Sequence, residues 1–393
     1  MKRIILKKKR SEAVKRRHPW VFSGAVHAMP DGQPEAGEIV RLEDGKDNLL
    51  AIGHYAGGSI ALRLFTFEEE EINADFWQKK IREAYNHRTA VGIGTDKDTT
   101  CYRLVHAEGD GLPGLIIDIY GGTAVLQCHS VGMHKVREEL TLALRTVLGQ
   151  KLTAVYDKSA ESLPQPYRLT VDNSYLFGKS GSQIVKENGC NFFVDWEAGQ
   201  KTGFFLDQRD NRALLATYSE DKTVLNAFAY SGGFSVYALR AGANVVHSVD
   251  ISKKAVEWTD RNIELNPSDR GVHESRAEDV MAFLKNNKKV YEVMVIDPPA
   301  FAKNVRKKHN AVQGYKRLNA LAISQIAPGG IIFTFSCSQV VDRQLFYDTI
   351  TAAGIEAGRR VRVIHHLSQP ADHPVSLFHP EGGYLKGLVL RVD

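Results

Sequence analysis

Three features are scarce or absent in this sequence of 393 residues, and each absence excludes a class of protein. No apolar run approaches the roughly 18 residues that cross a bilayer. The start of the chain has no apolar segment of signal-peptide type either, so we expect a cytoplasmic protein with no membrane contact. The four cysteines include no close pair with metal-ligand spacing, which argues against structural zinc, any other metal site and a disulfide framework.

Positive charge is concentrated in one part of the chain. The whole sequence carries a net charge of +5, whereas its first twenty residues hold nine basic side chains and one acid, a net of +8. Such a cluster is typical of a surface that binds phosphates. A solvated tail would explain the charge alone, but the aromatic segment 18–22 follows directly and favours a folded module that binds RNA or DNA. The candidate contact residues are Lys7, Lys8, Lys9, Arg10, Arg16 and Arg17.

Turns and apolar runs divide the chain into three segments. Residues 1–72 alternate short β-rich runs with Asp-Gly and Gly-Gly turns, which predicts a small β domain. Residues 73–182 combine helical patterns with hairpins and predict an α+β domain without a reactive cluster of side chains. In residues 183–393 strands and helices come to alternate, which predicts an α/β domain with a parallel sheet covered by helices on both faces.

The apolar periodicity also places individual elements. Helices are expected at 74–91, 133–148, 233–241, 252–265, 277–286, 311–326 and 342–353. In the α/β segment, strands are expected at 224–226, 245–249, 271–276, 293–296 and 331–335, with a final antiparallel hairpin at 361–367 and 384–392.

A glycine-rich turn follows the first strand of the α/β segment. Its glycines allow a ligand close to the backbone, although the turn lacks the spaced-glycine fingerprint of dinucleotide binders. Asp250 closes the second strand, where an acid accepts hydrogen bonds from ribose hydroxyls. Asp279 follows the third strand, where a carboxylate binds an exocyclic amine, caps a helix, or does both. The residues predicted to hold a nucleotide-like cofactor are Phe228, Tyr230, Ser231, Gly232, Gly233, Asp250 and Asp279.

Reactive side chains end the fourth and fifth strands. Asp297 precedes two prolines, which fix an extended turn without amide donors, and Cys337 follows Ser336. Because ligands gather at the carboxyl ends of the strands in a doubly wound sheet, this carboxylate and this thiol should face one pocket. A thiolate adds to C6 of a pyrimidine and makes C5 nucleophilic toward a sulfonium methyl donor, while a carboxylate supports the ring. The pair therefore predicts methyl transfer to a base, although an inert, buried cysteine is the common alternative.

Five motifs give the chain a resemblance to a known family. They are the segments 18–24, 201–209, 230–234, 297–299 and 335–338. With them the chain resembles bacterial ribosomal RNA large-subunit methyltransferase I over nearly its whole length. The resemblance implies an N-terminal PUA domain for RNA at 1–72, a central α+β domain at 73–182, and a Rossmann-like class I domain at 183–393 that uses S-adenosylmethionine (SAM).

The resemblance also implies a substrate and roles for individual residues. The family forms 5-methylcytosine in 23S ribosomal RNA, and the substrate here would be that RNA or a large-subunit assembly intermediate. By position, Cys337 would be the nucleophile and Asp297 its ring-contacting partner. Asp250 and Asp279 would hold the ribose and adenine of SAM. The residues that would border the cofactor pocket are Asp207, Gln208 and Arg209. A homodimer is compatible with the sequence, which leaves the oligomeric state open.

One departure from related enzymes leaves alternatives open. Many RNA cytosine-5 methyltransferases carry a second cysteine just after the proline that follows the aspartate, whereas here Ala300 and Phe301 follow the prolines. The base that removes the C5 proton is therefore not identified. An aromatic residue shortly after Asp-Pro-Pro also occurs in base-nitrogen methyltransferases, where it stacks on a flipped base. The alternatives are an rRNA guanine N7 or other base-nitrogen methyltransferase and a non-catalytic RNA-binding ribosome assembly factor, and neither needs the thiol of Cys337.

Overall fold

The computed structural model describes residues 1–302 and 304–393, which form two compact units. Unit 1 consists of Met1–Val185, Val194–Leu206 and Ala371–Gly382. Unit 2 consists of Lys186–Phe193, Asp207–Pro370 and Gly383–Asp393. Each unit thus contains segments that are far apart in sequence.

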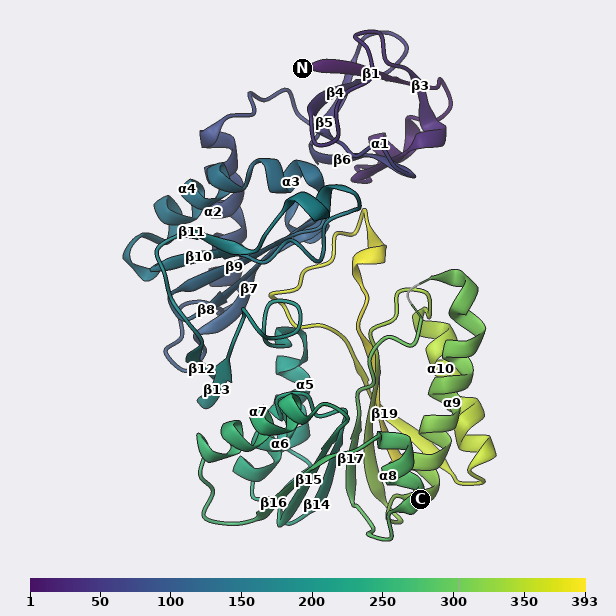
Figure 1. The fold of residues 1–393 in the computed structure, drawn as a ribbon. Helices are drawn as coiled ribbons and strands as arrows, with labels where there is room; N and C mark the ends of the chain where they lie inside the picture. Colours follow the sequence, from purple (N-terminus) through teal and green to yellow (C-terminus); the bar gives the residue numbers. More distant parts are fainter. Residues whose placement is uncertain (303) are drawn as a thin grey trace. The chain divides into compact units, whose positions relative to one another are not determined.

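The first sheet of unit 1 is formed by the N-terminal residues, purple in Figure 1. Its strands are β1 (Lys2–Leu6), β2 (Trp20–Phe22), β3 (Val26–Ala28), β4 (Ile39–Glu43), β5 (Leu49–Tyr55) and β6 (Ile60–Thr66), in the spatial order β2-β6-β5-β4-β1-β3. The short helix α1 (Glu12–Lys15) lies between β1 and β2 in the sequence. Alternate strand residues, such as Ile4 and Leu6 of β1 and Val40 and Leu42 of β4, are buried in one hydrophobic cluster. This period of two is typical of strands that bury one face, and the sheet agrees with the β domain predicted from short β-rich runs between turns.

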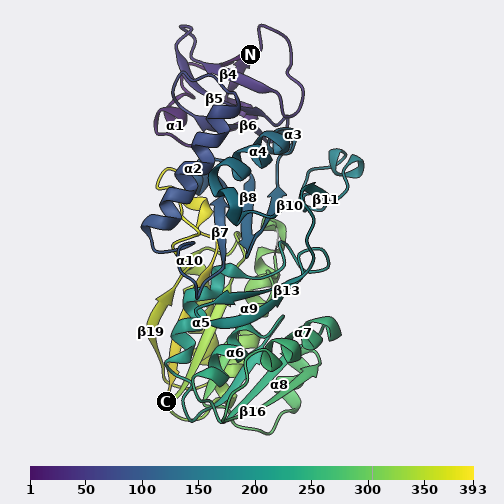
Figure 2. The ribbon, with the colours of Figure 1, turned by 90° about the vertical axis from the view of Figure 1, so that its left-hand side faces the viewer.

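The second sheet of unit 1 follows the α+β prediction for the middle of the chain. Its strands are β7 (Cys101–His106), β8 (Leu115–Tyr120), β9 (Thr123–Cys128), β10 (Ala154–Asp157) and β11 (Ser174–Phe177), in the spatial order β11-β10-β9-β8-β7. Helices α2 (Ala74–Ala90) and α4 (Arg137–Leu148) lie side by side and pack against this sheet (Figures 1 and 2). Trp77 and Ile81 of α2 and Leu140 and Leu144 of α4 share its hydrophobic core.

A two-stranded hairpin follows, made of β12 (Gln183–Glu187) and β13 (Cys190–Val194). Its turn residues Asn188 and Gly189 have φ values of 48° and 75°. A two-residue hairpin turn of type I′ needs positive φ at both central positions, which asparagine and glycine adopt at the lowest cost.

The sheet of unit 2 is doubly wound. Its strands are β14 (Thr223–Ala227), β15 (Val245–Asp250), β16 (Val272–Ala277), β17 (Val293–Ile296), β18 (Gly330–Ser336), β19 (Val361–Leu367) and β20 (Lys386–Val392), in the spatial order β16-β15-β14-β17-β18-β20-β19. Strands β14 to β18 run parallel, whereas β20 is inserted antiparallel between β18 and β19. The strand order reverses between β14 and β17, where such sheets bind their ligands. The predicted α/β class is confirmed.

Helices cover both faces of this sheet. They are α5 (Arg209–Ala216), α6 (Gly233–Arg240) and α7 (Lys253–Glu264) on one face, and α8 (Val280–Asn286), α9 (Lys308–Gln325) and α10 (Arg343–Glu356) on the other (Figure 1). Along β17, Val293 and Val295 pack in the core with α5 and α6, whereas Met294 and Ile296 pack with α8 to α10. Burial on both faces explains the continuous apolar runs of these strands. No helix within residues 1–302 and 304–393 combines the length and apolar character needed to span a bilayer.

Two differences from the sequence-based expectation have a clear physical cause. The helix expected at 133–148 is two helices, α3 (Val131–Lys135) and α4, because Val136 between them has non-helical angles of φ −98° and ψ 16°. Helix α5 was not expected at all. Its buried face carries the polar residues Arg209, Asn211 and Arg212, so the sequence shows no amphipathic pattern there.

Candidate active site

The structure brings Asp297 and Cys337 to the same edge of the sheet in unit 2. Asp297 directly follows β17 and Cys337 directly follows β18, and the two strands are parallel neighbours with Ile296 opposite Thr334. Both side chains are half-buried. This arrangement is the one expected from two apolar strands that end in reactive residues.

A relay of side-chain amides orients the carboxylate of Asp297. The Nε2 atom of Gln208 donates to Oδ2 of Asp297 at 3.0 Å. Oε1 of Gln208 in turn accepts a hydrogen bond of 2.6 Å from Nδ2 of Asn211, on the first turn of α5. Gln208 was predicted to border the cofactor, and the structure places it against the predicted catalytic carboxylate.

Cys337 lines a small cavity of about 210 Å³. The other residues that line it are Ala300, Ala302, Ser338, Gln339, Val340 and Tyr384. Oγ of Ser338 donates to the carbonyl oxygen of Ala302 at 2.8 Å, which ties the loop after β18 to the loop after β17. The other three cysteines are all buried, whereas Cys337 lines a cavity that a ligand can enter.

Two residues beside this cavity were not recognised in the sequence. Lys386, the first residue of β20, is only 4% exposed, and its ammonium donates to the carbonyl oxygens of Ser338 at 2.7 Å and Tyr384 at 2.9 Å. Burial lowers the pKa of Lys386 to about 8, against an opposing contribution from the charge of Cys337. Tyr315 of α9 is fully buried, and desolvation raises its pKa to about 12. The one sequence signal was a lysine inside the apolar run 384–392.

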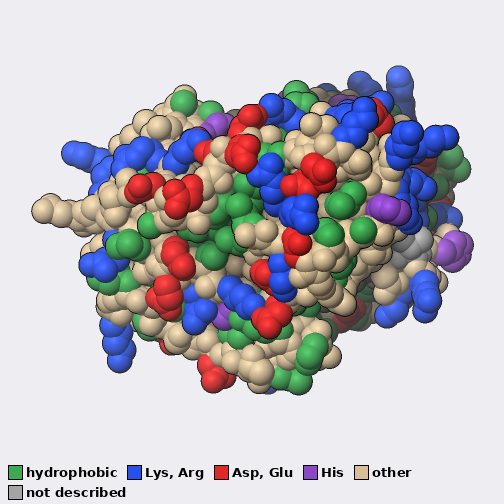
Figure 3. All heavy atoms as spheres, turned by 90° about the horizontal axis from the view of Figure 1, so that it is seen from above, with side chains coloured by type: hydrophobic (Ala, Val, Ile, Leu, Met, Phe, Trp, Pro, Cys, Tyr) green, Lys and Arg blue, Asp and Glu red, His purple; other side chains and the backbone are tan. Residues whose placement is uncertain are grey.

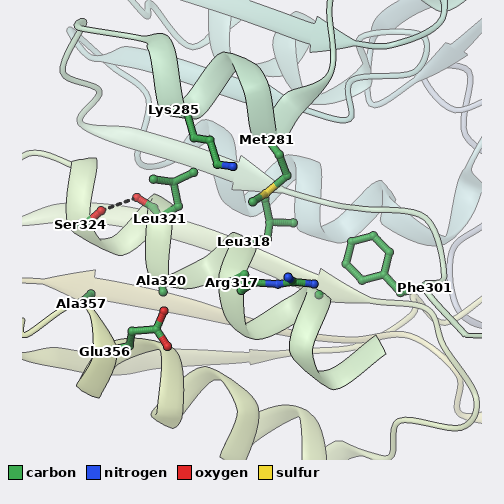
Figure 4. A pocket seen from close by; sticks show the side chains of 11 residues that line it. Met281, Lys285, Phe301, Arg317, Leu318, Ala320, Leu321, Ser324, Glu356 and Ala357 are labelled. Atoms are coloured by element: carbon green, nitrogen blue, oxygen red, sulfur yellow. Dashed lines mark hydrogen bonds between the residues drawn. The ribbon is translucent and has the colours of Figure 1, made fainter. Parts of the chain in front are cut away.

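Phe301 does not line the cavity of Cys337, although its neighbours Ala300 and Ala302 do. Its ring lies 4.6 Å from that of Tyr315, centroid to centroid. Figure 4 shows it at the end of a separate, larger pocket of about 670 Å³, beside side chains of α8 and α9 such as Met281 and Leu318. The alternating side chains of this loop thus face two different cavities.

The glycine-rich turn joins β14 to α6 and includes a strained backbone. Phe228 and Tyr230 have positive φ values of 62° and 48°, which non-glycine residues rarely adopt. Gly232 has a φ of 74°, and a Cβ atom there would lie 2.6 Å from Cγ2 of Thr259. The next glycine, Gly233, has Cδ of Arg212 at 3.0 Å from the position of a Cβ. Ser231 is buried in the same turn. These glycines therefore have a packing role whether or not a ligand binds.

Asp250 holds this turn through its carboxylate. Its Oδ2 accepts from the backbone N–H of Tyr230 and its Oδ1 from that of Ser252, each at 2.9 Å. Asp279 caps α8, because its Oδ1 accepts from the backbone N–H of Ala282 at 2.9 Å. A carboxylate oxygen has a second lone pair, so both side chains can still accept hydrogen bonds from a ligand. Two fixed carboxylates at the ends of β15 and β16, beside a glycine-rich turn, fit the ribose and base of a nucleoside cofactor.

The remaining predicted pocket residues have different partners. Asp207 is buried and accepts a hydrogen bond of 2.6 Å from the hydroxyl of Tyr384. Arg209 is also buried, with its Nε 3.6 Å from a carboxylate oxygen of Glu187. Arg212 donates two hydrogen bonds of 2.8 Å to the same carboxylate. The structure thus places Arg209 in a buried cluster of ions with Glu187 and Arg212. Its position in the sequence did not indicate this contact with Glu187.

The six basic residues predicted to bind RNA are all exposed in unit 1. Lys7 donates to the carbonyl oxygen of Gly24 at 2.8 Å, and Arg17 lies 3.3 Å from Glu68. The other four, Lys8, Lys9, Arg10 and Arg16, form no ion pair with any residue the structure describes. Basic side chains project at several places around the face of the molecule seen in Figure 3.

The aromatic segment next to this basic cluster is packed, as predicted. The indole N–H of Trp20 donates to a carboxylate oxygen of Glu108 at 2.8 Å. The guanidinium of Arg63 lies 5.4 Å from the centroid of the Trp20 ring, and the ring of His379 lies 4.3 Å from it. The basic residues therefore adjoin a folded surface.

Comparison with known proteins matches two family models to this chain. A model of S-adenosylmethionine-dependent methyltransferases covers residues 103–391, and a model of PUA-like domains covers residues 4–67. These matches confirm the predicted combination of a PUA-like domain and a SAM-dependent methyltransferase. The two carboxylates and the glycine-rich turn described above fit that cofactor.

Solved structures share the fold. One from Streptococcus mutans, assigned to the SAM-dependent methyltransferases, has a TM-score of 0.85 at 23% identity over 100% of both chains. Another, assigned to the methyltransferases and solved with the demethylated cofactor SAH, has a TM-score of 0.86 at 24% identity, also over 100% of both chains.

Curated proteins share the sequence more closely. Ribosomal RNA large subunit methyltransferase I from Aeromonas salmonicida is 38% identical over 99% of this chain and 98% of its own. The protein of the same name from Shewanella frigidimarina is 39% identical over 99% of both chains. The chain is therefore a SAM-dependent methyltransferase and belongs to the ribosomal RNA large subunit methyltransferase I family.

Proposed function

We propose that this protein methylates C5 of a cytosine in 23S ribosomal RNA, with Cys337 as the nucleophile that adds to C6. The observation that carries this proposal is a thiol and a carboxylate at the ends of two adjacent parallel strands, with the thiol open to a cavity. Methylation of a base nitrogen needs no thiol at this place.

The surroundings of Cys337 support a role in covalent chemistry. A cysteine that only packs is usually buried, as the other three cysteines are. Cys337 instead lines a cavity, beside a loop fixed by the hydrogen bond from Ser338 to Ala302. A cationic group nearby, such as the Lys386 ammonium, favours the thiolate, which is the nucleophilic form.

Asp297 suits the role of the carboxylate that contacts the pyrimidine ring. Its carboxylate is held by Gln208, so it needs no rearrangement to meet the ring as charge develops there. SAM, when bound, supplies an electrophilic methyl group on its sulfonium centre. Cys337 contributes the electron pair that forms the C6–S bond, C5 takes the methyl group, and the C5 proton passes to water. The C6–S bond then breaks, its electron pair returns to sulfur, and the C5–C6 double bond forms again.

Phe301 argues against the guanine N7 alternative. A base-nitrogen enzyme would use this aromatic ring to stack on the flipped base. Here the ring lies against Tyr315 and faces a different cavity from that of Cys337. The loop therefore offers alanines, and no aromatic face, to a base beside the thiol.

The choice of RNA rests on the relatives and on unit 1. Both relatives described above are named ribosomal RNA large subunit methyltransferases. The exposed basic residues beside a packed aromatic segment fit a module, residues 1–72, that contacts RNA phosphates. A central domain at 73–182 and a catalytic domain at 183–393 complete the proposed organisation, with Cys337 and Asp297 in the last.

A trapping experiment tests the chemistry. The full-length protein is incubated with SAM and a 23S RNA fragment that carries 5-fluorocytosine in place of cytosine. Because fluorine does not leave C5 as a proton does, we expect a covalent protein–RNA adduct that survives denaturation and maps to Cys337 by mass spectrometry. Cys337→Ala should give no adduct and no turnover, while SAM affinity measured by calorimetry stays unchanged.

The matched control is Cys337→Ser, which keeps a side chain of similar size but a poor nucleophile. It should behave as the alanine variant does. Methylation retained by either variant would refute the cysteine mechanism and favour a base-nitrogen enzyme. SAM and RNA binding without any turnover by the wild-type protein would favour a non-catalytic assembly factor.

A further inference from the structure

Lys386 occupies an unusual place for a lysine. It begins β20, directly opposite Ser336, the last residue of β18 and the residue before Cys337. Because β20 runs antiparallel to β18, its first residue lies at the edge of the sheet where β18 ends. The side chain is 4% exposed, so its charge is almost removed from water.

Lys386 contacts residues that line the same cavity as Cys337. Its ammonium donates to the carbonyl oxygens of Ser338 and Tyr384, and both of these residues line the cavity of Cys337. The ammonium forms no ion pair within 4.0 Å with the carboxylates of residues 1–302 and 304–393. A buried ammonium needs compensation for its lost hydration, and two neutral carbonyls supply only part of it.

Several charged or titratable groups act on Lys386. Cys337, on the loop after β18, favours the ammonium as a thiolate, and Asp342, the N-cap of α10, does so more weakly. Arg343 on the first turn of α10 opposes both, as does the burial itself. Of these groups, a thiolate at Cys337 favours the ammonium of Lys386 most.

We propose that the Lys386 ammonium is the positioning residue of the reaction, which holds Cys337 as a thiolate and fixes the loop that carries it. The inference rests on the proposed cysteine chemistry and extends it. Addition consumes the negative charge of sulfur, and expulsion restores it when the C6–S bond breaks and the electron pair returns to sulfur. A fixed cation therefore raises the fraction of Cys337 that is a thiolate before the attack and stabilises the thiolate that departs, and it needs no proton transfer of its own.

Alkylation by iodoacetamide tests this pairing without RNA or SAM. Only the thiolate reacts, and Cys337 is the cysteine open to a cavity while the other three are buried, so its labelling is followed by peptide mass spectrometry on the full chain. In Lys386→Met we expect the pH at half-maximal rate to rise by about one unit, which lowers the rate at neutral pH roughly tenfold. Lys386→Arg keeps the charge and should keep most of the reactivity.

Lys288→Met is the matched control, because it removes an exposed lysine of the same unit. Its alkylation profile should match the wild type. An unchanged profile in Lys386→Met would overturn the pairing, even if the fluorocytosine adduct still forms on Cys337. The opposite result, a shifted profile without any adduct, would retain the ion pair and refute the cytosine mechanism.

A second measurement avoids the risk that Lys386→Met does not fold. Electrostatic coupling is reciprocal, so removing the thiolate must act on the lysine as well. In Cys337→Ala, the pKa of Lys386 followed by NMR of its Cε resonance should fall below the wild-type value. An unchanged lysine titration would overturn the proposal independently.

Discussion

The side-chain amide of Gln208 reaches across 89 residues of sequence to donate a hydrogen bond of 3.0 Å to the carboxylate of Asp297. Gln208 immediately precedes α5, and Asn211 on the first turn of that helix fixes the amide orientation. The carboxylate proposed to act in catalysis is thus held by Gln208 and Asn211, and the sequence associated Gln208 only with the cofactor.

Loss of this amide should slow chemistry more than binding. In Gln208→Leu the ionised Asp297 loses one donor, and a hydrogen bond to a charged group contributes about 1.5–3 kcal/mol. We expect the rate of adduct formation with fluorocytosine RNA to fall roughly tenfold to a hundredfold, while the SAM Kd from calorimetry stays within about twofold. Gln344→Leu, on the exposed face of α10, is the control and should leave both quantities unchanged.

Cofactor affinity should depend on Asp250. Asp250→Ala removes the acceptor proposed for ribose hydroxyls and also leaves the backbone N–H groups of Tyr230 and Ser252 without their carboxylate. We expect SAM binding to weaken by about 1.5–3 kcal/mol in calorimetry. Asp269→Ala, an exposed acid of the same unit, should bind SAM as the wild type does. Equal affinity of Asp250→Ala and wild type would remove Asp250 from the site.

The basic residues of unit 1 should control the salt dependence of RNA binding. Lys8, Lys9, Arg10 and Arg16 are exposed and form no ion pair with described residues, so glutamine at all four positions should preserve the fold. If each neutralises one phosphate of single-stranded RNA, the slope of log K against log salt should shrink by about 3. Lys46→Gln, in an exposed loop of the same sheet, serves as the control. A quadruple variant with the wild-type slope would place the RNA contacts elsewhere.

A buried histidine should make unit 1 sensitive to acid. Burial lowers the pKa of His54 to about 3, and neither ring nitrogen has a hydrogen-bond partner among the residues described. The unfolded chain therefore takes up the proton first, near pH 6.5, so this contribution to stability is complete above pH 6.5 and is lost progressively between pH 6.5 and 3.

His54→Leu should remove part of this dependence. Between pH 6.5 and 4 the wild type should lose up to about 1.4 kcal/mol per pH unit more unfolding free energy than the variant. Trp77, whose ring stacks on that of His54 with centroids 6.1 Å apart, reports the transition by fluorescence during denaturant unfolding. His106 of unit 1 is also buried, and burial lowers its pKa well below the usual value, so some acid sensitivity should persist. Parallel profiles for wild type and variant would contradict the assignment; exposed His27→Leu should match the wild type.

Local patterns in the sequence predicted the helices and strands that bury apolar side chains. Strand β17 and strand β19 have the predicted bounds, because each is an apolar or alternating run between turn residues. Helix α5 escaped prediction because its buried positions hold arginines paired with Glu187, and this compensation is visible only in three dimensions. Apolar periodicity reveals elements that bury apolar side chains. It does not reveal elements that bury charged side chains in ion pairs.

The same distinction applies to the candidate site. Asp297 and Cys337 could be predicted from the sequence because each follows an apolar strand. In a doubly wound sheet, the carboxyl ends of such strands lie together at one edge. The role of Lys386 could not be predicted from the sequence, since its hydrogen-bond partner Ser338 lies 48 residues away. The one local signal, a lysine inside an apolar run, does not reveal whether the side chain points into the protein or bends toward water.

The position of β20 between β18 and β19 imposes an order on assembly. Strand β19 is made before β20 but, among the residues that the structure describes, forms its backbone ladder only with β20. Strand β20 in turn pairs with β18 through seven residues from Gly330 to Ser336. During synthesis, the newly emerged β19 therefore has no neighbour, and the flank of β18 stays open as a template for other extended chains. The step that closes this flank also delivers Lys386 to the loop of Cys337. Catalytic competence would thus appear late in folding, together with protection from aggregation, as one cooperative event.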